Sequence, residues 1–120
     1  ERSLHAAMQQ QADLLEAQRQ TLERQLTDRR RELVQLDAEA RLHRQRLDLA
    51  RQALARLESL QSDNFISSAQ VQAKAEEVLA VQASLQGLER QRASQQREIG
   101  TLEAERRELP LRMQATTGEL

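Results

Sequence analysis

Arg56, Leu60 and Ser67 place a cation, an apolar side chain and a hydroxyl at the spacing Arg-x3-Leu-x6-Ser. Arg56 and Leu60 are four residues apart, so in a helix they lie on the same face. The planar guanidinium of arginine donates hydrogen bonds to carbonyl and carboxylate oxygens, and a serine hydroxyl both donates and accepts. Phe65, the only aromatic residue of the chain, lies between Leu60 and Ser67. This combination indicates a surface that binds another protein.

Each of these residues also has an ordinary structural interpretation. Arg56 can be a solvated helix residue, Leu60 a surface leucine, and Ser67 the N-cap of a second helix. Ser67 can fill both roles, because capping uses its oxygen as an acceptor and leaves the hydroxyl proton free. Phe65 is either a plug that closes the turn over the first core layer or an anchor for a partner. The sequence leaves these alternatives open.

Residues that would support catalysis or metal binding are sparse. The chain has no cysteine and no glycine-rich phosphate loop, and its two histidines, His5 and His43, are far apart in sequence. The basic run 29–31 is flanked by Asp28 and Glu32 and has no aromatic neighbours for base stacking, which indicates a solvated helix face. We therefore expect no catalytic activity, no cofactor, no metal site and no nucleic-acid partner.

The composition is typical of long helices. Charged residues make up 31% of the chain and aromatic residues 1%, and Ala, Glu, Lys, Leu and Arg exceed half of it, as in coiled coils. A compact core would use several aromatic rings, so we expect a thin apolar seam instead. The formal net charge of -1 gives no global attraction to nucleic acid or anionic membranes.

No apolar run approaches the roughly 20 residues that span a bilayer, and there is no signal-peptide pattern. Because the chain begins at Glu1 without an initiator Met, we expect a fragment of a longer protein.

Two heptad patterns predict two long helices. The first covers about residues 4–62, with a positions at Ala12, Arg19, Leu26, Leu33, Ala40, Leu47 and Leu54. The second covers about residues 67–109, and its a positions begin Val71, Val78, Leu85, Arg92, Ile99 and Arg106. The arginines in these seams are expected to lay their stems along the seam and to place their head groups in water. At ~1.5 Å per residue, about 55 helical residues extend on the order of 80 Å.

The tip between the helices, residues 63–66, has clear turn signals. Asn64 tolerates the left-handed conformation that ends a helix. Ser67 and Gln70 have the spacing of a capping box, and Ile66 and Val71 that of a hydrophobic staple. If the chain folds back near Asn64, the a positions of one helix face the d positions of the other. The two residue numbers of each facing pair then add up to 128.

The sequence thus predicts an all-α fold, a long two-helix antiparallel coiled-coil hairpin that forms a single domain over residues 1–120. Two facing pairs illustrate the meshed registers, Ala50 with Val78 and Leu47 with Val81. Pro110 removes a backbone donor and restricts the residue before it, so the second helix is expected to kink or end near Leu109. Residues 110–120 then form an exit segment.

The turn resembles the hairpin tip of HlyD-family periplasmic adaptors, also called membrane fusion proteins, of Gram-negative type I secretion systems. The Arg56, Leu60 and Ser67 spacing is similar to the Arg-Leu-Ser tip motif of that family. The stretch 57–71, LESLQSDNFISSAQV, resembles the family tip, and the Leu-Pro step at Leu109 is similar to that of HlyD-like members. The helix lengths favour an HlyD-like or RaxA-like secretion adaptor over a drug-efflux one. The resemblance covers the hairpin only, because the lipoyl and β-barrel domains of such adaptors are not in the sequence.

The resemblance implies a function and partners. Arg56 would bond carbonyls or carboxylates of a TolC-like outer-membrane channel, Leu60 would fill a groove of the channel, and Ser67 would bond its backbone, with Phe65 as a further contact. The parent protein would be anchored in the inner membrane beside an ABC transporter, and its periplasmic hairpins would assemble as a homo-oligomer, a hexamer in the family. The chain would then bridge the transporter to the channel for peptide or protein export.

Two other classes of function remain open from the residues alone. One is a cytoplasmic structural coiled-coil arm, which requires no special chemistry at the turn. The other is an oligomerisation module that pairs helices between chains.

Overall fold

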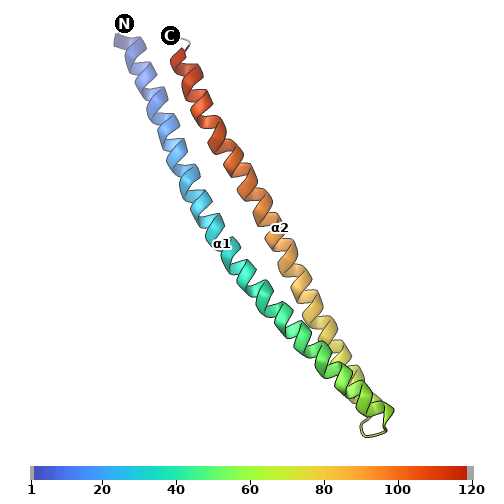
Figure 1. The fold of residues 1–120 in the computed structure, drawn as a ribbon. Coiled ribbons are helices and arrows are strands. Elements are labelled where there is room, and N and C mark those ends of the chain that lie inside the picture. The colour runs from blue at the N-terminus through green and yellow to red at the C-terminus, as the bar shows by residue number, and fades with distance from the viewer. Residues whose placement is uncertain (1, 119–120) are drawn as a thin grey trace. The chain divides into compact units, whose positions relative to one another are not determined.

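The computed structural model describes the backbone of residues 2–118 and the side chains of residues 2–115. It contains two α-helices, α1 (Arg2–Ser62) and α2 (Ser68–Gly118), which run antiparallel and are joined by a short turn (Figure 1). No break interrupts α1 at any residue. The predicted fold class is confirmed, since the chain is an all-α two-helix hairpin.

The hairpin consists of two compact units, and both helices contribute to each. The turn unit comprises Val34–Ala93 and includes the connection between the helices. The terminal unit comprises the described parts of the remainder, residues 2–33 of α1 and 94–118 of α2. Each unit has its own apolar cluster, and the two are described in turn.

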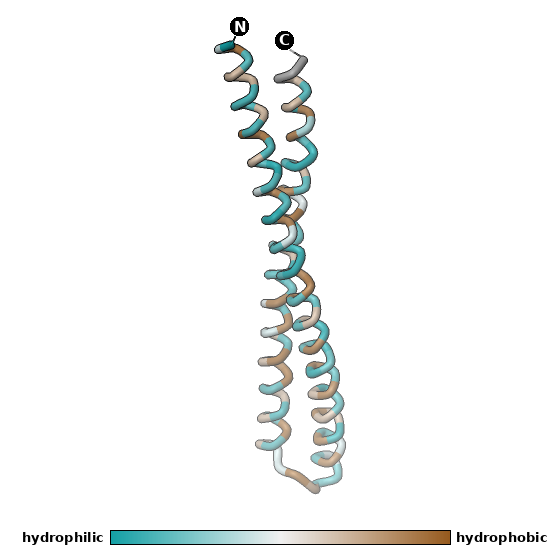
Figure 2. Tube along the Cα trace, turned by 90° about the vertical axis from the view of Figure 1, so that its left-hand side faces the viewer, coloured by the Kyte–Doolittle hydropathy of each residue, from teal (hydrophilic) through white to brown (hydrophobic). Residues whose placement is uncertain are grey.

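Small and medium-sized aliphatic side chains form the core of the turn unit. The buried residues are Ala40, Leu47, Ala50, Val78 and Leu85, and the partly buried Leu54, Val81 and Leu88 pack against them. All eight occupy predicted a or d positions, so the register that the heptads predicted is confirmed here. Figure 2 shows the resulting interleaving of hydrophobic and hydrophilic residues along both helices.

The terminal unit has a separate cluster of larger side chains. Leu15, Leu22 and Leu109 are buried together, with Leu102 and Met113 packed against them. Leu26 of this unit is fully buried. Complete burial of a leucine side chain contributes roughly 1.5–3 kcal/mol, so these residues hold the two arms together.

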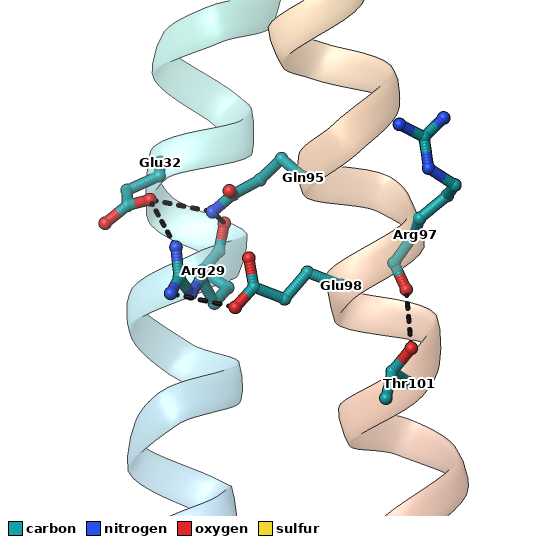
Figure 3. Close-up of polar contacts among 6 residues, drawn as sticks. All are labelled: Arg29, Glu32, Gln95, Arg97, Glu98 and Thr101. Atoms are coloured by element: carbon teal, nitrogen blue, oxygen red, sulfur yellow. Dashed lines mark hydrogen bonds and ion pairs between the residues drawn. The ribbon is translucent and has the colours of Figure 1, made fainter.

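A polar layer interrupts the seam of the terminal unit (Figure 3). Gln95 is only 8% exposed, and its Nε2 donates to the backbone oxygen of Arg29 at 3.1 Å and to Glu32 Oε2 at 2.8 Å. The guanidinium of Arg29 lies 2.9 Å from Glu98 of α2 and 3.5 Å from Glu32. Figure 3 also shows Thr101, whose hydroxyl donates to the Arg97 backbone oxygen at 3.2 Å.

The seam arginines were predicted to place their head groups in water, and their side chains are indeed partly exposed, but three of them also pair with carboxylates of the other helix. Arg92 pairs with Asp37 in the turn unit. In the terminal unit Arg106 lies 3.5 Å from Glu23, and Arg29 pairs as described above. Each of these ion pairs joins the two helices. Their carboxylates lie at the flanks of the seam, where the long arginine stems can reach them.

Of the two expectations for the second helix near Leu109, an end is wrong, because α2 continues through Pro110 to Gly118. A proline inside a helix lacks one backbone hydrogen bond. Leu109 is 2% exposed and belongs to the terminal cluster with Met113, so continuing the helix keeps both side chains packed. Pro110 itself is exposed and is not part of the buried cluster. The predicted exit segment 110–120 is helical up to Gly118, and its last two residues lie outside the described part of the chain.

Candidate functional site

The turn that joins the helices is fixed by backbone hydrogen bonds. The amide of Phe65 donates to the carbonyl of Leu60 at 2.9 Å, and that of Asn64 donates to the carbonyl of Gln61 at 2.9 Å. These two bonds form a Schellman motif, the common end of an α-helix in which the residue after the cap is left-handed. Asn64 is that residue, with a φ of 62°. The predicted role of Asn64 is therefore confirmed.

The start of α2 is fixed by side chains. The amide of Gln70 donates to Ser67 Oγ at 3.4 Å, and the amide of Ser67 donates to Gln70 Oε1 at 3.3 Å. This reciprocal pair is the predicted capping box. Ser67 is therefore the N-cap of α2. Its oxygen accepts the capping hydrogen bond, so its hydroxyl group can still donate a hydrogen bond to a partner.

Two apolar side chains project from this fixed turn. Leu60 is 41% exposed and Phe65 is 75% exposed. The Schellman bond joins their backbones directly, and residues at these two positions of the motif commonly make a hydrophobic contact. Of the two alternatives for Phe65, the plug over the core is wrong, because a plug would be buried. The backbone here turns away from the core at Asn64, which leaves the ring in solvent.

Arg56 lies one helical turn before Leu60 on the same face of α1 and is exposed. Among residues 2–115, it makes no hydrogen bond or ion pair with any other side chain. Its five donors are therefore not engaged within the described chain. The turn brings together an unengaged guanidinium, two exposed apolar side chains and a serine hydroxyl, which can bind a surface that carries acceptors beside an apolar groove.

Other kinds of site are absent from the described residues. No group of three or more histidine, aspartate or glutamate side chains in residues 2–115 could hold a metal ion. Within the described part, neither helix is long and apolar enough to cross a membrane. His43 lies at its seam position, where its Nδ1 is 2.9 Å from the Glu39 backbone oxygen, so this nitrogen carries the proton and donates.

An open groove of about 780 Å³ lies in the terminal unit. It is lined by Leu14, Ala17, Gln18, Thr21, Leu22, Glu105, Glu108, Leu109 and Arg112. Glu108 and Arg112 on its rim pair with each other at 3.0 Å. The groove holds no set of side chains arranged for catalysis, and none of Arg56, Leu60, Phe65 and Ser67 lines it.

Sequence reasoning missed two exposed leucines on α1, Leu42 and Leu49. They are 47% and 63% exposed and lie in the turn unit outside the a and d positions. The signal that could have found them is their spacing of one heptad at the same c position.

No protein-family model, curated protein or solved structure matches the chain. The resemblance to periplasmic adaptors therefore depends on the turn residues and on the two-helix architecture.

Proposed function

We propose that this chain is the periplasmic hairpin of an HlyD-like type I secretion adaptor and that its turn docks on a TolC-like outer-membrane channel. The observation that carries the proposal is the exposure of Leu60 and Phe65 on a turn whose backbone is fixed on both sides. Burial of an exposed phenylalanine ring by a partner lowers the free energy, because apolar surface leaves water. A rigid turn loses little conformational entropy when a partner covers it.

The docking surface has an apolar centre and polar neighbours. Covering Phe65, which is 75% exposed, stabilises a complex by up to roughly 1.5–3 kcal/mol. Leu60 contributes less, because it is only 41% exposed before a partner binds. Arg56 donates to carbonyl or carboxylate oxygens of the channel, since its guanidinium has no partner among the described residues. Ser67 donates its remaining hydroxyl proton to a backbone oxygen of the channel while it continues to cap α2.

In the assembled system the parent protein is anchored in the inner membrane beside an ABC transporter. Its hairpins form a homo-oligomer, a hexamer by the family resemblance, and the turns meet the channel at their outer end. The transporter supplies the energy, and the hairpins form part of the conduit for an exported peptide or protein. The chain itself performs no chemical step.

The test is substitution in the gene of the full-length parent protein, followed by measurement of exported cargo. Leu60→Asp places a charge at the centre of the docking surface and is expected to abolish export, while circular dichroism of the purified variant chain remains that of the wild type. Leu79→Asp is the matched control, because Leu79 is 64% exposed on α2 and is not part of the turn. Normal export by the Leu60→Asp strain would refute the proposal.

A further inference from the structure

The arginines of the seam are separated by whole heptads. On α2, Arg92 and Arg106 occupy a positions two heptads apart, and on α1 Arg29 occupies a d position. Facing residues of the hairpin have numbers that add up to 128, and the buried clusters of both units agree with this register. Arg29 is therefore level with the buried Ile99. Ile99 lies midway between the two arginines of α2, one heptad from each.

Arg29 makes polar contacts that this register permits (Figure 3). Its guanidinium lies 2.9 Å from the carboxylate of Glu98, the residue before Ile99. Its backbone oxygen accepts a hydrogen bond from Gln95 Nε2 at 3.1 Å. A displacement of one arm by a heptad moves these partners about 10.5 Å along the helix axis. That distance exceeds what the side chains can follow, so both contacts would be lost.

A displacement by one heptad is the alternative alignment that an apolar seam alone would allow, because a positions still face d positions. In this chain the displacement has a further consequence. In one direction Arg29 becomes level with Arg106, and in the other direction it becomes level with Arg92. All three side chains are half-buried. Either displacement therefore places two guanidinium groups opposite each other in one layer of the seam, where like charges repel.

The ion pair of Arg92 in the turn unit gives a second cost. Arg92 pairs with Asp37 across the helices. After a displacement by one heptad, Arg44 or Arg30 stands in the place of Asp37, according to the direction. Each displacement thus replaces an attractive charge by a repulsive one at this level as well.

We propose that Arg29 fixes the register of the two arms. It binds Glu98 in the observed alignment, and it repels Arg106 or Arg92 in the two alignments that lie one heptad away. A polar residue in an apolar seam can specify register at a cost in stability. Here the position midway between two like charges excludes displacement in both directions. The inference does not rest on the proposed function, because register is a property of the hairpin alone.

Three double-cysteine chains report the register, since the chain has no cysteine of its own. Met113→Cys is common to all three and is combined with Met8→Cys, Leu15→Cys or Leu22→Cys, at successive d positions of α1. Leu15 is level with Met113 in the observed register. Met8 and Leu22 become level with Met113 only after displacement by one heptad, each in one direction. With the native Arg29, only the Leu15 chain is expected to form an intrachain disulfide on oxidation.

Substitutions of Arg29 in each of these chains test the proposal. Arg29→Glu attracts Arg92 and Arg106 and repels Glu98, so the two displaced-register disulfides are expected to rise at least about tenfold relative to the native-register one. Arg29→Gln removes a charge without adding one, and a rise of about threefold is expected. Arg31→Glu is the matched control, because Arg31 is exposed at an outward f position, and it should leave the ratio unchanged.

Circular dichroism of the reduced chains shows whether each variant remains helical. If Arg29→Glu unfolds the terminal unit, Arg29→Gln still decides the question, because glutamine is a good helix former and adds no repulsion. A native-register disulfide alone in the Arg29→Gln chains would overturn the proposal. An equal change of the ratio in the Arg31→Glu control would also overturn it, since the effect would then not depend on the seam position.

Discussion

At the scale of single residues, the turn depends on Asn64 more than on any apolar contact. Its left-handed φ of 62° allows the two Schellman hydrogen bonds that end α1. Only glycine and, to a lesser degree, asparagine and aspartate adopt this conformation at low cost. The turn at Asn64 places Phe65 outside both helices, where the ring is 75% exposed. The exposure of Leu60 has a different cause, since Leu60 lies within α1 outside the a and d positions.

Substitution of Asn64 by valine is expected to destabilise the hairpin by about 1–2 kcal/mol, the cost of a left-handed conformation for a β-branched residue. Substitution by glycine is expected to be neutral or slightly stabilising, since glycine is the most frequent residue at this position. Urea unfolding followed by circular dichroism measures both. Equal stability of the valine and glycine variants would show that the left-handed turn does not form in solution.

Glu16 provides a titration test in the terminal unit. The guanidinium of Arg19 donates to both of its carboxylate oxygens, at 2.7–3.2 Å. This hydrogen bonding, with a smaller contribution from the charge of Arg19, holds the pKa of Glu16 below its ordinary value despite some desolvation. A lowered pKa in the folded state means that the stabilisation is present above the unfolded pKa and is lost as the pH falls through the folded one.

Arg19→Gln is therefore expected to raise the pKa of Glu16 toward the ordinary value, as measured by NMR titration of its side-chain carboxyl. Arg24→Gln is the control, because Arg24 is exposed and does not pair with Glu16 among the described residues. A Glu16 pKa that is the same in the wild type and in the Arg19 variant would contradict the bidentate contact.

At the scale of the helices, Pro110 would be expected to end α2, but the packing of the apolar residues beside it keeps the helix intact. Proline interrupts the hydrogen-bond ladder of α2 by removing the bond to the carbonyl four residues earlier. The apolar residues that flank it, Leu109 and Met113, belong to one cluster with Leu15 and Leu22. Ending the helix at Leu109 would remove Met113 from that cluster, so the helix continues at a cost in backbone energy.

Pro110→Ala is expected to stabilise the terminal unit by about 1–3 kcal/mol, because alanine restores the missing bond and favours the helix. The exposed ring contributes no core contact that the substitution would lose. The measurement is the urea midpoint of the variant, with Leu111→Ala as a control for a change at a neighbouring exposed residue. An unchanged midpoint would mean that α2 is already frayed at this position in solution.

At the scale of the whole chain, the sequence predicts the architecture better than it predicts the surface. The heptad positions from Ala40 to Leu88 predict the core of the turn unit correctly, because an apolar side chain repeated at heptad spacing is buried along one seam. The ion-pair partner of Arg92, which is Asp37, could not be predicted from the sequence. A long arginine side chain can reach several acidic residues. The exposure of Phe65 required the backbone conformation at Asn64, and apolar type alone does not give it.

The connectivity of the two units predicts the order in which they open. In the turn unit, the two helical segments are linked by the short connection 63–67. In the terminal unit, the two segments are linked by the 60 residues of Val34–Ala93, which form a long flexible loop whenever the turn unit is unfolded. The loop-entropy difference between connections of about 5 and about 60 residues is roughly 2 kcal/mol. The terminal unit therefore gains much of its stability from a turn unit that is already folded.

Leu47→Ala and Leu22→Ala separate the two units, since each removes one buried leucine at an expected cost of about 2–5 kcal/mol. Leu47 belongs to the turn unit and Leu22 to the terminal unit. Leu47→Ala is expected to lower amide protection against hydrogen exchange in both units, because opening of the turn unit removes the short connection. Leu22→Ala is expected to lower protection only in residues 2–33 and 94–118. Equal loss of protection throughout the chain in both variants would show that the hairpin unfolds as one cooperative unit.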